Sequence, residues 1–196
     1  MKLNLPNKLT LLRVILIPFF LVCIYIKFPM HYFAALVVFA AASITDALDG
    51  NIARKRNLVT NFGKFLDPLA DKVLVLTALA VFVELPEVHF GAIPLIIIAA
   101  REFMVSGLRL VAADSGIVVA AGIWGKLKTA FTMTAIVVTL LWLSICNDLS
   151  LSLPEGLVTA ADNIIIPLLM WISVILTVIS GGIYLKGYWN LIDSDK

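Results

Sequence analysis

The sequence predicts an all-α integral membrane protein with six transmembrane helices in one domain that covers residues 1–196. Hydrophobic residues make up 61% of the chain and charged residues 14%, compared with about 45–50% and about 25% in soluble domains. Apolar stretches of about 20 residues, the length that crosses a bilayer, recur along the chain. The net charge is +2 and the basic residues cluster at helix ends, so the composition argues against a soluble protein and against nucleic-acid binding.

Each predicted helix ends at residues that commonly interrupt helices. In chain order the breaks centre on Pro29, the polar run 54–61, Pro86, the segment 113–121 and the segment 147–161. No small-residue cleavage site follows the first apolar core, so the first helix is not expected to be a removable signal peptide. Cys23 and Cys146 are expected to pack as small hydrophobic side chains, without a disulfide. The predicted helices cover residues 9–27, 33–53, 65–84, 91–112, 123–146 and 163–186.

Positive charges predict the orientation of these helices. One set of helix ends carries most of the lysines and arginines, and the opposite set carries only Lys27. Because basic residues stay preferentially on the cytoplasmic side, both chain termini are predicted to be cytoplasmic. The basic residues assigned to this side are Lys2, Lys8, Arg13, Arg54, Lys55, Arg56, Lys64, Lys126, Lys128, Lys186 and Lys196.

Four aspartates lie at the predicted cytoplasmic end of the second and third helices. Asp46 and Asp49 close the second helix, and Asp67 and Asp71 open the third. Residues three or four apart share one face of a helix, so each pair projects together. The short connection makes the two helices antiparallel neighbours, and the two pairs then form a cluster of four carboxylates.

Four carboxylates in a region of low dielectric repel each other unless cations lie among them. Oxygen ligands favour Mg²⁺ or Mn²⁺, and two ions about 3.5–4 Å apart are compatible with this number of ligands. Such ions usually bind substrate phosphates as well, so the cluster predicts a site for a phosphate-bearing ligand. The alternative is a set of helix-terminal carboxylates that face water.

The residues between the two aspartate pairs allow two interpretations. Gly50 and Ala53 leave room for a flat ligand or for a neighbouring helix. Arg54 could bind a phosphate or anchor in the lipid headgroups. Pro68 could either start the third helix or kink it by freeing the carbonyl of Lys64, and the sequence leaves both open.

The segment from Asp46 to Asp71 resembles, without a departure, the signature D-x2-D-G-x2-A-R-x8-G-x3-D-x3-D of the CDP-alcohol phosphatidyltransferases. The resemblance implies six transmembrane helices, a homodimer and an active site open to the cytoplasmic leaflet of the bacterial inner membrane. It implies that the four aspartates hold two divalent ions at the diphosphate of a CDP-linked donor, with Asp71 as the general base. It also implies that Gly50, Ala53, Arg54 and Gly63 lie against the nucleotide.

Three further segments, 7–13, 101–109 and 125–129, are similar to bacterial members of the family that use glycerol 3-phosphate as the acceptor. In the first segment, Asn7 and Thr10 are expected at the nucleotide, although helix capping and anchoring would also explain Asn7, Thr10 and Arg13. Arg101, deep in the fourth helix, requires an anionic partner. The phosphate of an acceptor could supply it, so Arg101, Arg109, Lys126 and Lys128 are expected to bind this phosphate. Ion pairing between helices is the alternative for both arginines, and anchoring for both lysines.

The expected reaction is transfer of the phosphatidyl group from CDP-diacylglycerol to the primary hydroxyl of glycerol 3-phosphate, with release of CMP. Inositol phosphate and serine are alternative acceptors. Intramembrane carboxylates also occur in proton- or cation-coupled transporters, but there they usually lie near the membrane midplane. A scaffold protein would have little use for two facing aspartate pairs.

Overall fold

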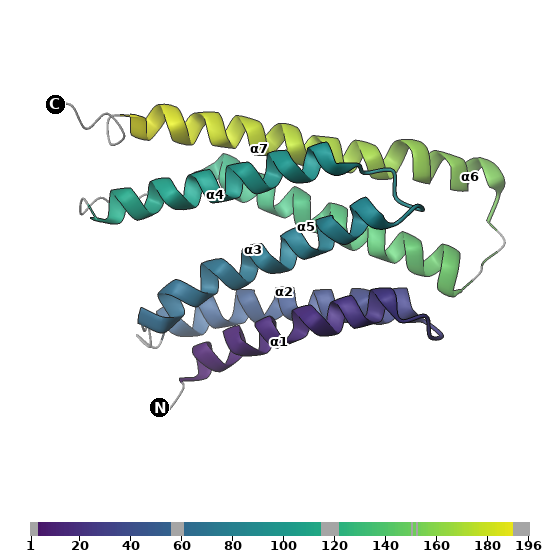
Figure 1. Cartoon of the computed structure of the whole chain (residues 1–196), viewed down its shortest axis with the longest axis horizontal. Coiled ribbons are helices and arrows are strands. Elements are labelled where there is room, and N and C mark those ends of the chain that lie inside the picture. The colour runs from purple at the N-terminus through teal and green to yellow at the C-terminus, as the bar shows by residue number, and fades with distance from the viewer. Residues whose placement is uncertain (1–3, 56–60, 115–121, 150, 152, 190–196) are drawn as a thin grey trace. The chain divides into compact units, whose positions relative to one another are not determined.

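The computed structural model describes residues 4–55, 61–114, 122–149, 151 and 153–189, and the side chains of Pro6, Asp114 and residues 47–65 lie outside this description. The described part of the chain is helical and contains no strand, which confirms the all-α prediction (Figure 1). The helices are α1 (Leu5–Tyr25), α2 (His31–Lys55), α3 (Asn61–Glu84), α4 (Ala92–Asp114), α5 (Ile123–Leu143), α6 (Glu155–Ala160) and α7 (Ile166–Tyr188), with π-helical turns η1 (Ser144–Asp148) after α5 and η2 (Ala161–Ile165) between α6 and α7.

The prediction of a long connection at residues 147–161 is wrong. The chain is helical again from Glu155, and α6, η2 and α7 form one continuous helical segment. Pro154 precedes this helix, and the carboxylate of Glu155 lies in its first turn, where the helix dipole favours a negative charge. The π-helical turn η2 adds a wide turn to the segment, which no periodicity in the sequence indicates.

Three described helical segments are long and apolar enough to cross a membrane: Asn7–Tyr25, Ile123–Asp148 and Glu155–Tyr188. In α2 the side chains are described as far as Asp46, and His31–Asp46 forms a shorter apolar helical segment. Helices α3 and α4 carry charged residues within their length, among them Asp67, Asp71, Arg101 and Glu102. The six-helix prediction is thus confirmed for long helical segments, while the count of six membrane spans stays a prediction.

The chain divides into two compact units, and the boundaries fall inside α3, inside α5 and after the first residue of α6. The first unit comprises Met1–Val81 and Ile136–Glu155. In this unit α1 and α2 pack antiparallel (Figure 1). The rings of Phe20 and Phe39 lie 6.1 Å apart in the core between them. The carboxylate of Asp148, in η1, accepts a hydrogen bond from the backbone N–H of Phe33 at 2.7 Å and so caps the first turn of α2.

The second unit comprises Phe82–Ala135 and Gly156–Lys196. Here α4 packs against α7, and α5 is tied to α7 by a hydrogen bond of 2.5 Å between the hydroxyls of Thr132 and Ser173. The contact between α4 and α7 is close because Gly181 has no side chain: a Cβ atom there would lie 3.0 Å from Cγ of Arg101. This close packing brings the polar side chains of α4, α5 and α7 together.

Candidate functional site

In the first unit, α1 provides a buried cation for an aspartate of the signature. Arg13 is fully buried, and its Nη1 lies 3.0 Å from Oδ1 of Asp46. Its Nε donates a hydrogen bond to the backbone carbonyl of Ala42 at 3.4 Å. The carboxylate of Asp46 remains 41% exposed, so it is held on one side by Arg13 and open to solvent on the other.

A second contact connects α1 with α3. The buried hydroxyl of Thr10 donates a hydrogen bond of 2.5 Å to Oδ1 of Asp67. Asn7, one helical turn before Thr10, is also buried. Burial of Thr10 and Arg13 contradicts the headgroup-anchoring interpretation of this segment, because an anchoring side chain lies at the membrane surface. The sequence did not identify Arg13 as the partner of Asp46, although a buried arginine in an apolar helix signals a nearby anion.

Helix α3 carries the other aspartates of the signature. Asp67 and Asp71 lie one turn apart and are both half-buried. Pro68 lies inside α3, seven residues after its first residue Asn61. The interpretation that Pro68 starts the helix is therefore wrong, and its lack of an N–H leaves the helical hydrogen bond to the carbonyl of Lys64 unmade.

The described carboxylates are oxygen ligands of the kind that a divalent cation such as Mg²⁺ prefers. Arg13 and Thr10 each contact one oxygen of a carboxylate, and a carboxylate has two oxygens that can act as ligands. Within the described side chains, no group of three or more His, Cys, Asp or Glu residues forms a metal site. The predicted four-carboxylate cluster cannot be complete without Asp49, whose side chain, like those of Gly50, Ala53, Arg54 and Gly63, lies outside the described residues. The cluster therefore stays a prediction.

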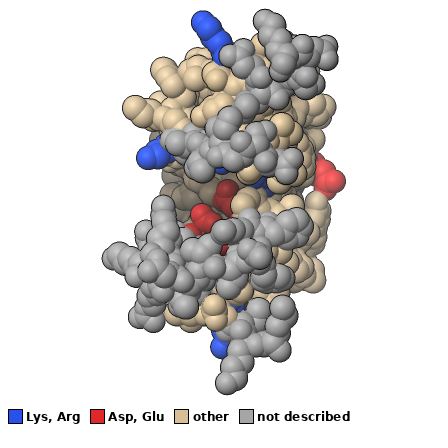
Figure 2. Space-filling model, turned by 90° about the vertical axis from the view of Figure 1, so that its left-hand side faces the viewer, with Lys and Arg blue, Asp and Glu red and all other residues tan. Residues whose placement is uncertain are grey.

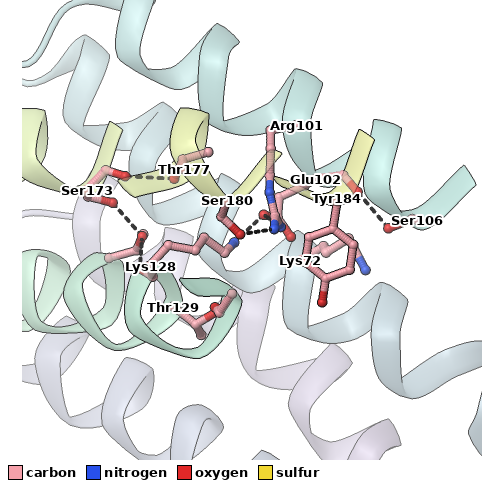
Figure 3. A network of polar contacts seen from close by, with 12 residues as sticks. Lys72, Arg101, Glu102, Ser106, Lys128, Thr129, Ser173, Thr177, Ser180 and Tyr184 are labelled. Carbon is pink, nitrogen blue, oxygen red and sulfur yellow. Dashed lines mark hydrogen bonds and ion pairs between the residues drawn. The ribbon is translucent and has the colours of Figure 1, made fainter. Parts of the chain in front are cut away.

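The second unit contains a buried cluster of two cations and one anion. Glu102 on α4 pairs with Lys128 on α5 and, at 3.1 Å, with Nη1 of the neighbouring Arg101 (Figure 3). Arg101 and Lys128 are each only 8% exposed. Arg101 also donates to the hydroxyl of Ser180 at 2.6 Å, whereas its buried Nε has no hydrogen-bond partner in the described part of the chain. The three charged side chains together carry one positive charge in excess.

The other two predicted basic residues are exposed. Arg109, two turns after Arg101 on α4, donates from Nη2 to the hydroxyl of Tyr184 at 3.1 Å. Lys126 is exposed on α5 and is not part of the hydrogen-bonded network described for this unit. Basic and acidic side chains are both visible on the face drawn in Figure 2. The ion pair of Arg101 is with Glu102 of its own helix, whereas the pair between helices is made by Lys128. Burial of Lys128 contradicts its interpretation as a headgroup anchor.

Sequence reasoning missed the contribution of α7 to this network. Ser173, Thr177, Ser180 and Tyr184 are all buried on this apolar helix. Their spacing of four, three and four residues places them on one face, which is a signal that the sequence does contain. Ser180 accepts a hydrogen bond from Arg101 (Figure 3), and Tyr184 accepts one from Arg109. This face of α7 therefore orients the two arginines.

Comparisons with known proteins identify the family. Residues 3–179 match the CDP-alcohol phosphatidyltransferase family. The chain is 42% identical to the CDP-diacylglycerol–glycerol-3-phosphate 3-phosphatidyltransferase of Bacillus subtilis, over 98% of this chain and 99% of the relative. The enzyme with the same name from Rickettsia bellii is 39% identical over 93% of this chain and 94% of the relative. The one from Escherichia coli is 43% identical over 72% of this chain and 79% of the relative. With its uninterrupted aspartate signature, the chain therefore belongs to the CDP-alcohol phosphatidyltransferase family of enzymes.

Proposed function

We propose that this enzyme transfers the phosphatidyl group of CDP-diacylglycerol to glycerol 3-phosphate, forming phosphatidylglycerophosphate and CMP. The observation that carries the proposal is identity of 42% over nearly the full length of an enzyme with this name. The structure supports it with two features: signature aspartates held by buried side chains of α1, and a network with an excess positive charge in the second unit.

The aspartates are the donor side of the proposed site. Asp46, Asp49, Asp67 and Asp71 would hold Mg²⁺ or Mn²⁺, most simply as two ions. When bound, these ions supply positive charge to the diphosphate of the donor and to the departing CMP. Arg13 and Thr10 orient two of the carboxylates before substrate binds. Gly50, Ala53, Arg54 and Gly63 are assigned to the nucleotide, together with Asn7 and Thr10.

The basic residues of the second unit are the acceptor side. The exposed guanidinium of Arg109 is suited to bind a phosphate, because its planar donors can form two parallel hydrogen bonds to phosphate oxygens. Arg101 and Lys128 share the single carboxylate of Glu102, so these three side chains would add one net positive charge to the acceptor side. Lys126 adds an exposed positive charge.

In the proposed reaction, the primary hydroxyl of glycerol 3-phosphate attacks the phosphorus that bears the diacylglycerol. The new P–O bond forms as the bond to the CMP phosphate breaks in line with it. Asp71 accepts the proton of the attacking hydroxyl, and CMP leaves with the bonding electrons. The chain would act as a homodimer in the bacterial inner membrane, with its site and both termini on the cytoplasmic side.

The test is release of CMP from CDP-diacylglycerol by the purified full-length protein in detergent. The acceptors are glycerol 3-phosphate, serine, inositol and inositol phosphate, each with Mg²⁺, with Mn²⁺ and with chelator. We expect release with glycerol 3-phosphate in the presence of either ion and none with chelator. Release only with another acceptor would refute the acceptor assignment, and release in chelator would refute the metal assignment. No release with any acceptor would refute the proposed function.

A further inference from the structure

Tyr184 lies at the point where three helices of the second unit meet. Its ring is buried on α7, and its hydroxyl oxygen accepts hydrogen bonds from Nη2 of Arg109 on α4 and from the backbone N–H of Gly122 before α5, both at 3.1 Å. Gly122 is also the residue whose carbonyl accepts the first backbone hydrogen bonds of α5. One phenol oxygen therefore joins the start of α5 to an arginine of α4.

The same ring contacts two guanidinium groups. The Cζ atoms of Arg101 and Arg109 lie 5.5 Å and 5.6 Å from the centre of the Tyr184 ring. Figure 3 shows Arg101 and Tyr184 next to each other. Both distances are within the range of cation–π attraction. Two guanidinium groups close to the same ring repel each other. The electron-rich ring offsets part of this repulsion. Arg109 is exposed, but the hydroxyl and the ring of Tyr184 both hold its guanidinium in place.

This arrangement suits the capture of an anion. A free exposed arginine samples many rotamers, and ordering it on binding costs about 1–2 kcal/mol of side-chain entropy. The contact with Tyr184 uses one donor of Arg109 and leaves donors on the opposite edge of the guanidinium for a ligand. Arg109 is thus oriented before the ligand arrives, which strengthens binding without adding a contact.

We infer that Tyr184 is a positioning residue for the acceptor: it holds Arg109 in the orientation that binds the phosphate of glycerol 3-phosphate. The inference rests on the proposed function. A purely structural role is the competing explanation, because the ring also packs against Val105, Leu108 and Tyr188. Packing of the core requires the ring, whereas the hydrogen bond that orients Arg109 requires the hydroxyl. Removal of the hydroxyl therefore tests positioning, and a measurement of thermal stability reports the loss of the Gly122 contact.

The experiment compares Tyr184→Phe with Tyr188→Phe in the full-length enzyme. Both variants lose one phenol hydroxyl from the same end of α7 and keep the ring. For Tyr184→Phe we expect KM for glycerol 3-phosphate to rise about tenfold, the usual size of one lost hydrogen bond to a charged group. The maximal rate and KM for CDP-diacylglycerol should change less than twofold, and inorganic phosphate should inhibit correspondingly more weakly. Tyr188→Phe should behave as the wild type.

A double variant tests the route through Arg109. Arg109→Gln should itself raise KM for glycerol 3-phosphate, and adding Tyr184→Phe should raise it no further, because the positioned group is gone. Additive effects, or an unchanged KM in Tyr184→Phe, would overturn the inference. A Tyr184→Phe protein that is unfolded, or that loses thermal stability and rate at an unchanged KM, would show a structural hydroxyl and overturn it equally. Failure of the proposed function is seen separately, as absence of glycerol 3-phosphate-dependent CMP release by the wild type.

Discussion

Arg13 is a fully buried cation on an apolar helix, and its neighbours give the physical reason for its position. A buried charge without a partner is strongly unfavourable. The guanidinium of Arg13 forms an ion pair with Asp46 and donates a hydrogen bond to the carbonyl of Ala42. The pair also benefits the aspartate, because Arg13 restricts its carboxylate to one orientation while 41% of the side chain stays exposed. The interaction therefore serves both the stability of the first unit and the proposed donor site.

Replacing Arg13 by Gln should damage both properties. We expect CMP release to fall by one to two orders of magnitude and the free energy of unfolding to fall by about 1–3 kcal/mol, below the cost of breaking a fully buried pair because Asp46 is partly exposed. Steady-state assays and thermal unfolding in detergent measure these effects. Lys8→Gln removes an exposed charge from the same helix and serves as the control. Wild-type activity in Arg13→Gln would refute the role of the pair.

Asp71 is expected to act on the proton of the acceptor hydroxyl. Asp71→Asn keeps the shape of the side chain and removes its basicity, so the maximal rate should fall by several orders of magnitude while the thermal stability stays close to that of the wild type. Glu87→Gln, an exposed carboxylate beyond the other end of α3, is the control for loss of charge. A rate within tenfold of the wild type would remove Asp71 from the role of base.

At the scale of elements, the contact between α4 and α7 decides where Arg101 and Arg109 lie. Ser180 and Tyr184 orient these arginines from α7, and Gly181 allows α7 to approach Arg101 closely. Glu102 adds a connection from α4 to Lys128 on α5. The network is thus a property of the packed helices, since no single helix contains all of its partners.

Adjacent glycines of α7 provide a matched test of this packing. A Cβ atom at Gly181 would lie 3.0 Å from Cγ of Arg101 and 3.4 Å from Cε of Met104, whereas a Cβ at Gly182 would meet nothing within 4 Å. Gly181→Ala should therefore lower the melting temperature and raise KM for glycerol 3-phosphate. Gly182→Ala should stabilise the helix by up to about 1 kcal/mol, as alanine does relative to glycine, and leave KM unchanged. Equal behaviour of the two variants would contradict the close approach of α7 to Arg101.

At the scale of the whole molecule, the distribution of charge predicts the orientation in the membrane. Helices α3 and α4, which fall outside the three apolar spans, carry Asp67, Asp71, Arg101 and Glu102. Intramembrane charges of this kind are costly unless they are paired or face a polar region. Contacts within each unit lower this cost, since Asp67 accepts a hydrogen bond from Thr10 and Glu102 pairs with Arg101 and Lys128.

Single cysteines can test the orientation. In a Cys23→Ala, Cys146→Ala background, Lys27→Cys should react with a membrane-impermeant thiol reagent added outside intact bacterial cells. Lys186→Cys, also exposed in the structure, should react only after the membrane is opened. The expectation follows from the excess of basic residues on the predicted cytoplasmic side. The reverse labelling pattern would show that the chain is inserted the other way.

The long helices could be predicted from the sequence because the apolar length that crosses a membrane and the breaks between such stretches are local properties. The position of Asp67 and Asp71 one turn apart on α3 could be predicted for the same reason, since a spacing of four residues places side chains on one helix face whatever the rest of the chain does. The pairing of Asp46 with Asp49 stays a prediction. Pro68, which allowed two local interpretations, and the helical start at Glu155 could not be assigned correctly, because both depend on the surroundings of the helix.

The sequence by itself determined the all-α architecture, the family signature from Asp46 to Asp71 and the excess of charge at one set of helix ends. Only the tertiary structure decided that Arg13 pairs with Asp46, that Thr10 donates to Asp67, and that Tyr184 binds Arg109 across 75 residues. The physical reason is the distance along the chain over which each kind of interaction acts. Periodicity and spacing act within one helix, whereas the partner of a buried charge is selected by which helices pack together.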